Sequence, residues 1–236
     1  MRLTLRDGRL AARPLELKLP GGTVTGALAL NGRGPASSAD ADLAYEGIRL
    51  KRAFRGTPFV DQTSGTVRGH LYLLGVGDSP AELAGTLRGH VALVVDDGTL
   101  SGLLIEGLDL DVVEALTLYL GDVAVPIRCA VAGLTVAEGV ASIERLAIDT
   151  RDSVIRGQGW IDLGEETLDL RLVGQGKDFS LIDPDAPVFV RGSLRSPSLS
   201  VDGTAFVPLI ELGLQGNARC DQLTERVMAI GRDDER

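Results

Sequence analysis

Hydrophobic and polar residues alternate with a period of two over most of the 236-residue chain, most clearly in Ser153–Leu172. The apolar side chains of its two runs are Ile155, Ile161 and Leu163, then Leu168, Leu170 and Leu172. Because successive side chains of a β-strand point to opposite faces, this pattern predicts a hairpin with one apolar and one polar face. The connection Gly164-Glu165-Glu166 has the glycine and polar residues that a reversal needs.

The same alternation predicts strands before and after this hairpin. They cover residues 3–5, 15–19, 24–30, 39–45, 71–74, 91–95, 127–136, 140–149, 188–194 and 199–201. Asp96-Asp97-Gly98 predicts a hairpin turn into one more strand, 100–105, and Ser196-Pro197-Ser198 predicts another turn. About a dozen strands separated by turn residues are typical of antiparallel β structure, so the expected fold class is mainly β.

A few segments depart from the two-residue period and predict helices. Residues 79–83 have a serine cap, proline at the first helical position and an acid in the first turn, which favours a short helix. Residues 109–120 place apolar side chains at helical spacing and predict one amphipathic helix. We expect residues 48–54 to form a short helix or an irregular edge. We also expect residues 221–230 to form a short helix near the end of the chain.

The composition restricts the classes of function. A net charge of −9 argues against nucleic acid and against charge-driven adhesion to anionic lipid headgroups, because both need a basic surface. Aromatic residues are only 4% of the chain, so the apolar surface must consist of aliphatic side chains. No apolar run is long enough to span a bilayer, and the first ten residues lack the apolar core of a signal peptide.

The sequence contains no recognisable catalytic or metal-binding motif. It lacks a G-x-S-x-G elbow and a glycine-rich phosphate loop, and Asp149 and Asp162 are interpreted as strand-end and turn carboxylates. His70 and His90 occupy equivalent places in the repeated Arg-Gly-His motif, but they lack a third ligand and lie out of phase with their apolar neighbours. We therefore expect no enzymatic activity, no cofactor and no metal site.

The apolar faces of these strands have two interpretations. They could pack on each other as the core of a β-sandwich, or they could line a groove in a single curved sheet. From the residues alone the sandwich is the simpler interpretation, because most one-faced strands build cores.

Four pieces of the chain, taken in order, carry a resemblance to a known family. They are LRDGRLAARPLELKLPGGTVTGALALNG, SGTVRGHLYLLGVGDSPAELAGTLRGHVALVVDDGTLSGLLIEGLDL, the hairpin Ser153–Leu172, and VRGSLRSPSLSVD. The ordered set resembles the C-terminal region of the AsmA family of bacterial envelope proteins, over about residues 1–225. A late cysteine such as Cys220 fits the same resemblance.

The resemblance implies a β-groove protein related in architecture to the chorein-type bridge lipid transporters. Such proteins are anchored in the inner membrane by an N-terminal helix and extend into the periplasm, where they help phospholipids reach the outer membrane and support its assembly. The resemblance therefore favours an antiparallel curved sheet that forms a groove or flattened half-barrel, with two or three short helices. This sequence has no N-terminal membrane helix, so we expect a fragment of a longer protein or a short homologue.

The expected organisation is one AsmA-like β-groove domain over 1–225, with possible halves 1–62 and 63–203, and a partly helical tail over 204–236. We expect this domain to be a non-enzymatic, periplasmic segment that binds phospholipid acyl chains. Each buried methylene would stabilise the complex by roughly 0.8 kcal/mol. The alternative is a structural or protein-interaction β module of the envelope that docks protein partners and carries no lipid.

The predicted groove-lining residues are Leu28, Leu30, Leu71, Leu73, Val91, Leu93, Ile155, Ile161, Leu168, Leu170 and Leu172. In the periplasm that the resemblance implies, Cys129 and Cys220 could form a disulfide between the sheet and the tail. The alternative for these residues is a buried free thiol at Cys129 and an unrelated thiol in the tail.

Overall fold

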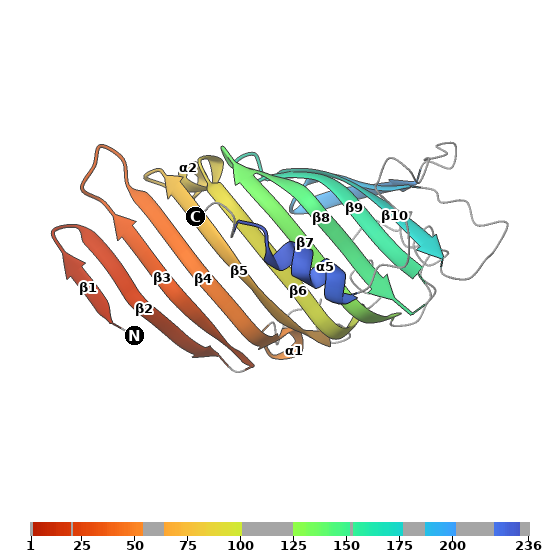
Figure 1. Ribbon diagram of the computed structural model, residues 1–236. Coiled ribbons are helices and arrows are strands. Elements are labelled where there is room, and N and C mark those ends of the chain that lie inside the picture. Colours follow the sequence, from red (N-terminus) through yellow and green to blue (C-terminus); the bar gives the residue numbers. More distant parts are fainter. Residues whose placement is uncertain are drawn as a thin grey trace.

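The computed structural model describes residues 2–19, 21–53, 64–100, 125–151, 153–176, 187–201 and 220–231. In these residues, twelve strands form one antiparallel sheet in which each strand pairs with its neighbours in sequence (Figure 1). The strands are β1 (Leu3–Arg6), β2 (Arg9–Leu19), β3 (Gly22–Asn31), β4 (Ser38–Arg49), β5 (Ser64–Val76), β6 (Arg88–Leu100), β7 (Val125–Ala137), β8 (Val140–Thr150), β9 (Ser153–Asp162), β10 (Thr167–Gly176), β11 (Val188–Ser193) and β12 (Ser196–Val201). β1 and β12 do not pair with each other in this part of the chain, so the sheet is open rather than a closed barrel.

Three short helices accompany the sheet in the described residues: α1 (Leu50–Ala53), α2 (Pro80–Gly85) and α5 (Cys220–Met228). The predicted cap of α2 is confirmed, because Ser79 Oγ accepts a hydrogen bond from the backbone N–H of Glu82 at 3.2 Å. The predicted fold class, mainly β with antiparallel strands and short helices, is confirmed as well. In the same residues, no helix has the length and apolar character needed to cross a membrane. The helix predicted at 109–120 lies outside the described residues.

Two predicted turns are wrong. Asp96–Gly98 does not reverse the chain, because β6 continues to Leu100 and both Asp96 and Gly98 pair with β7. Asp97 has a φ of 45°, and this single left-handed residue distorts the backbone of the strand locally without ending the pairing with β7. Ser196–Ser198 belongs to β12, and the reversal lies one step earlier, at Leu194-Arg195. Pro197 is tolerated there because β12 pairs on one side only among the described strands.

The strand register assigns alternate residues to two continuous faces, since directly paired residues point to the same side of a sheet. One side, the apolar face, contains the residues in phase with Leu5, Leu17, Leu28, Leu43, Leu71, Leu93, Leu134, Ile148, Ile155, Leu170 and Val190. The other side, the polar face, contains the residues in phase with Arg6, Lys18, Thr25, Asp42, Tyr72, Ala92, Val131, Ala147, Arg156, Asp169 and Arg191. The two faces thus keep their character from β1 to β11.

The most deeply buried core lies between α5 and the polar face. Leu223 and Val227 of α5 pack on a platform of small apolar residues, which is formed by Ala92, Val94, Val131 and Ala147 of β6, β7 and β8. Gly133 extends this platform, because a Cβ at that position would lie 2.1 Å from Ile230 Cδ1. The helix therefore covers this apolar part of the polar face, and the apolar face lies on the other side of the sheet.

The C-terminal strands of the sheet bend away from α5. Figure 1 shows α5 in front of β6 and β7, whereas the blue C-terminal strands β11 and β12 lie behind β8 and β9. The apolar face is consequently on the inner side of this bend.

Candidate functional site

The register brings all eleven predicted groove-lining residues to the apolar face. On one part of the sheet, Leu71 of β5 is paired with both Leu43 of β4 and Val91 of β6. On the other part, Ile161 of β9 pairs with Leu168 of β10. The sequence prediction missed the residues that join these two parts, which are Ala130, Ala132 and Leu134 of β7 with Ile143, Leu146 and Ile148 of β8. In β8, the alternation of Leu146 and Ile148 with Arg145 and Asp149 was a usable signal. The other residues gave none, because residues 129–134 of β7 have no polar side chain and the register of β8 shifts between Ile143 and Arg145.

The side chains of this face are only partly covered. Ten of the eleven predicted residues are half-buried and the remaining one, Leu30, is 42% exposed. Toward the N-terminal edge, Leu3 and Leu5 are 59% and 72% exposed. All twelve described strands belong to one sheet, so no second sheet in this part of the chain covers these leucines. The sandwich interpretation is therefore wrong for the described residues.

One small cluster on the apolar face is fully packed. Val67, Val95 and Ile127 are buried there, and Tyr45 of β4 packs against them. The Tyr45 ring occupies the space beside Gly69, where a Cβ would lie 2.9 Å from Tyr45 Cε2. Its hydroxyl donates a hydrogen bond of 2.6 Å to the carbonyl oxygen of Ala92 on β6. Tyr45 thus spans from β4 to β6 and fixes the middle of the sheet.

We expect Tyr45→Phe to lower the free energy of unfolding by about 1 kcal/mol, because it removes this hydrogen bond and leaves the Ala92 carbonyl with one partner fewer. Urea unfolding measures the change. Tyr72→Phe is the matched control, since Tyr72 lies half-buried on the polar face. Equal losses in the two variants would contradict the role given to Tyr45.

The same side chain predicts a pH dependence. Burial raises the pKa of Tyr45 to about 12, from 10.0 for an unperturbed tyrosine. A raised pKa in the folded state means that the stability from neutral Tyr45 is complete below pH 10.0 and is lost as the pH rises toward 12. The stability difference between the wild type and Tyr45→Phe should therefore shrink over that interval in urea unfolding at a series of pH values.

Two glycines of β9 allow close contacts on the apolar face. Gly159 has a φ of +136°, and a Cβ there would lie 2.0 Å from the Asp169 carbonyl oxygen. At Gly157 a Cβ would lie 2.3 Å from Leu146 Cδ2 and 2.8 Å from Leu172 Cδ2. The leucines of β8 and β10 therefore meet over Gly157, and the apolar surface is continuous across β9 although β9 supplies few side chains to it.

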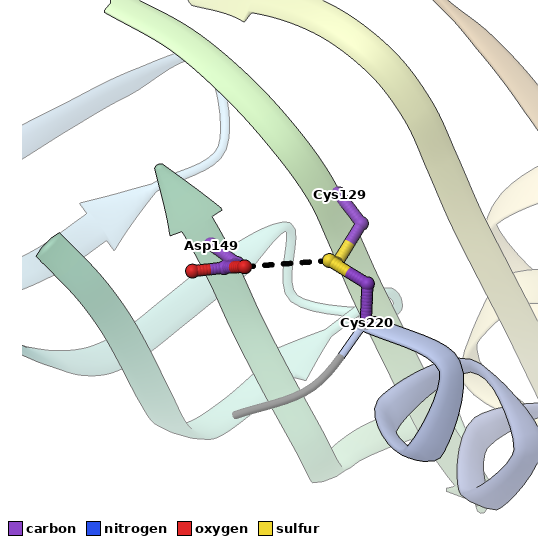
Figure 2. A group of neighbouring side chains, drawn as sticks. All are labelled: Cys129, Asp149 and Cys220. Carbon is purple, nitrogen blue, oxygen red and sulfur yellow. Dashed lines mark hydrogen bonds between the residues drawn. A yellow bond between two sulfur atoms is a disulfide. The ribbon is translucent and has the colours of Figure 1, made fainter. Parts of the chain in front are cut away.

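A disulfide between Cys129 of β7 and Cys220 holds α5 on the polar face (Figure 2). The S–S distance is 2.05 Å, and the bond closes a sequence separation of 91 residues. Of the two arrangements left open by the sequence, the structure contains the pair. The start of α5 is thus tied to the polar face, on the side of the sheet opposite the apolar face.

Asp149 of β8 lies beside this disulfide and is only 1% exposed. Arg128 donates hydrogen bonds of 2.9 Å from Nε and Nη2 to the two carboxylate oxygens. These hydrogen bonds raise the pKa of Arg128, whose side chain is 57% exposed. The sequence interpretation of Asp149 as a simple strand-end carboxylate misses this burial, whereas Asp162 does act in a turn by accepting from the N–H groups of Gly164 and Glu165.

The ligand atoms of Cys129, Asp149 and Cys220 lie within 4.8 Å of one another, a spacing that could suit a metal ion. Cys220 Sγ is 3.4 Å from Asp149 Oδ2, the contact drawn as a dashed line in Figure 2. Because each sulfur is bonded to the other, neither has a thiolate to offer a metal or a proton to donate to Asp149. The carboxylate is already held by Arg128. The disulfide and the Arg128–Asp149 ion pair therefore have a structural role, in which the disulfide holds α5 on the sheet.

His70 and His90 lie together on the polar face, as their phase in the sequence predicts, with ring centroids 5.6 Å apart. They are half-buried rather than facing solvent, because the chain that follows α5 covers them. His70 Nε2 is 3.0 Å from the carbonyl oxygen of Ile230, and a Cβ at Gly231 would lie 2.1 Å from His90 Cε1. The pair therefore supports the end of the helix.

Comparison with known proteins gives a consistent result. The model of a family described as "AsmA family" matches residues 1–146. The AsmA family protein YhjG of Escherichia coli (strain K12) is 30% identical over 212 residues, which cover 89% of this chain and 30% of that protein. The chain thus spans about a third of the length of this curated relative. No solved structure matches the chain.

Proposed function

Because this chain belongs to the AsmA family, whose members have envelope-related functions, we propose that its apolar face binds the acyl chains of phospholipids in the periplasm. The observation that carries the proposal is the band of half-exposed aliphatic side chains that continues across the open sheet. Large exposed apolar surfaces on proteins mark sites for apolar partners. A lipid tail is such a partner, and it can follow a band that crosses many strands.

The chemistry of the band suits acyl chains and discriminates little between them. Transfer of a methylene from water to an apolar surface contributes roughly 0.8 kcal/mol, so a fully covered acyl chain would supply most of the binding free energy. The predicted lining residues are all leucine, isoleucine or valine and have no hydrogen-bonding side chains that could select a headgroup. A surface with these properties is suited to passing many kinds of lipid along the protein rather than to selecting one of them.

The proposed role is a non-enzymatic one. The segment handles lipid that is on its way to the outer membrane and thereby supports the assembly of that membrane. It faces the periplasm from the inner membrane, where the longer protein supplies the anchor and contacts other envelope proteins. The relative's greater length leaves room for such parts, since the chain covers 30% of it.

Native mass spectrometry and lipid extraction of the purified protein test the proposal. We expect phospholipid to copurify with the wild type, and Leu170→Asp and Ile161→Asp to abolish it, because each buries a charge where an acyl chain would lie. Both side chains are half-buried, so the variants are expected to remain folded by circular dichroism.

Ser142→Asp is the matched control. It adds the same charge at an exposed position of the polar face, opposite Trp160, and should leave the bound lipid unchanged. A wild-type protein that carries no phospholipid would count against the proposal and would favour a protein-interaction module of the envelope. Loss of lipid from the control as strongly as from Leu170→Asp would also contradict it.

A further inference from the structure

Three arginines lie close together on the polar face of neighbouring strands. Arg145 of β8 pairs with Gly133, Arg156 of β9 with Ala147, and Arg171 of β10 with Gln158. This register makes Arg156 a diagonal neighbour of both other arginines. Diagonal neighbours on one face of a sheet are about 7 Å apart, within reach of long side chains. Three guanidinium groups are therefore gathered on one small area of a protein whose net charge is −9.

Within the described residues none of the three arginines has an ion-pair partner. The aspartates of β8–β10 on the same face are bound by other groups. Asp149 is held by Arg128, Asp169 by Arg191 at 3.0 Å, and Asp162 by backbone N–H groups. The positive charge of the cluster is thus not neutralised by this part of the chain.

Two nitrogen atoms of the cluster are buried without a hydrogen-bond partner, Arg156 Nη1 and Arg171 Nε. Buried donors normally have a partner, because leaving one unpaired is costly, and more so when the group is charged. Burial and the neighbouring charge of Arg145 both lower the pKa of Arg156. The empty protein therefore bears the cost of two unpaired donors and of repulsion between like charges.

We propose that Arg145, Arg156 and Arg171 form a binding site for a phosphate group on the polar face of β8–β10. A phosphate has several acceptor oxygens, and guanidinium groups bind it through paired, charge-assisted hydrogen bonds. One such anion accepts from the unpaired nitrogens and relieves the repulsion among the three cations. The site is separate from the proposed acyl-chain surface, which lies on the opposite face of the same strands.

Isothermal titration calorimetry with inorganic phosphate, at an ionic strength fixed with chloride, tests the site. We expect phosphate to bind the wild type, and Arg156→Gln and Arg171→Gln to weaken the binding at least tenfold. Arg9→Gln is the matched control, because Arg9 is an exposed arginine of the same face on the distant strand β2, and its affinity should stay within twofold. Thermal unfolding adds a second readout: phosphate should raise the melting temperature of the wild type but not that of Arg156→Gln.

A flotation assay with phosphatidylglycerol vesicles, compared with phosphatidylcholine vesicles, identifies the source of the phosphate group. Binding of inorganic phosphate alone supports a free anion as the ligand. Binding to phosphatidylglycerol vesicles that is lost in Arg156→Gln supports a lipid headgroup. The proposal is overturned if neither probe binds, or if Arg156→Gln and Arg171→Gln bind as tightly as Arg9→Gln. Without phosphate, Arg156→Gln should melt no lower than the wild type, because it removes a guanidinium group that has one buried nitrogen without a partner and is repelled by Arg145.

Discussion

Replacing Gly89 by alanine is expected to lower the free energy of unfolding by about 3 kcal/mol or more. Gly89 of β6 has a φ of +137°, a backbone conformation that side chains disfavour. A Cβ there would lie 1.9 Å from the Tyr72 carbonyl oxygen of β5, a backbone atom that cannot move away without disrupting the pairing of the two strands. Backbone strain and overpacking each contribute of the order of 1–3 kcal/mol, and here both act.

Urea unfolding followed by circular dichroism measures this loss. Gly32→Ala is the matched control, because Gly32 lies in an exposed loop and its Cβ would come no closer than 3.6 Å to another atom. That variant should change the free energy of unfolding by less than about 0.5 kcal/mol. A Gly89→Ala protein with the same midpoint as the control would show that the close approach of β5 and β6 is not required.

Removing the disulfide is expected to lower the free energy of unfolding by about 2–4 kcal/mol, because the bond closes a long loop and restricts the unfolded chain. Cys220→Ser breaks it with little change in side-chain volume. The packing of Leu223 and Val227 on the polar face remains, so α5 should still dock but open more often. Hydrogen exchange of the α5 amides should therefore accelerate more than exchange in β5.

A reducing agent provides the control for this experiment. Dithiothreitol should shift the unfolding midpoint of the wild type toward that of Cys220→Ser and leave the variant unchanged. Non-reducing mass spectrometry should find one covalent link between the peptides that contain Cys129 and Cys220. If reduction left the wild-type midpoint in place, the disulfide would not be a stabilising tether.

The apolar face could be predicted from the sequence because strand periodicity depends on local residues alone. Once Leu28, Leu71 and Leu170 are each placed on the apolar side of their own strand, only the register is needed to join them. Turn residues hold that register in place, and the predicted turn at Gly164–Glu166 is confirmed. The misassigned turn at Asp96–Gly98 has a turn-like composition, but the pairing of those residues with β7 keeps them in the sheet.

The polar face could not be predicted to the same degree because its features combine residues that are distant in sequence. Val91–Val95 is an apolar run in which Ala92 and Val94 point to the polar face. They are buried there by α5, which begins at Cys220. The burial of Asp149 depends on a helix and a disulfide partner far along the chain. Arg145, Arg156 and Arg171 come from three strands, and only the register of β8–β10 shows that they are neighbours.

We expect acyl chains to lie on one face of the sheet and not on the other, and photocrosslinking along β10 is the sharpest test of this expectation. A photoreactive amino acid is placed in turn at Thr167, Leu168, Asp169 and Leu170 of the protein expressed in bacteria. Adducts to phospholipid acyl chains are expected at Leu168 and Leu170, on the apolar face, and not at Thr167 and Asp169, on the polar face. Adducts of equal yield at all four positions, or at none of them, would contradict it.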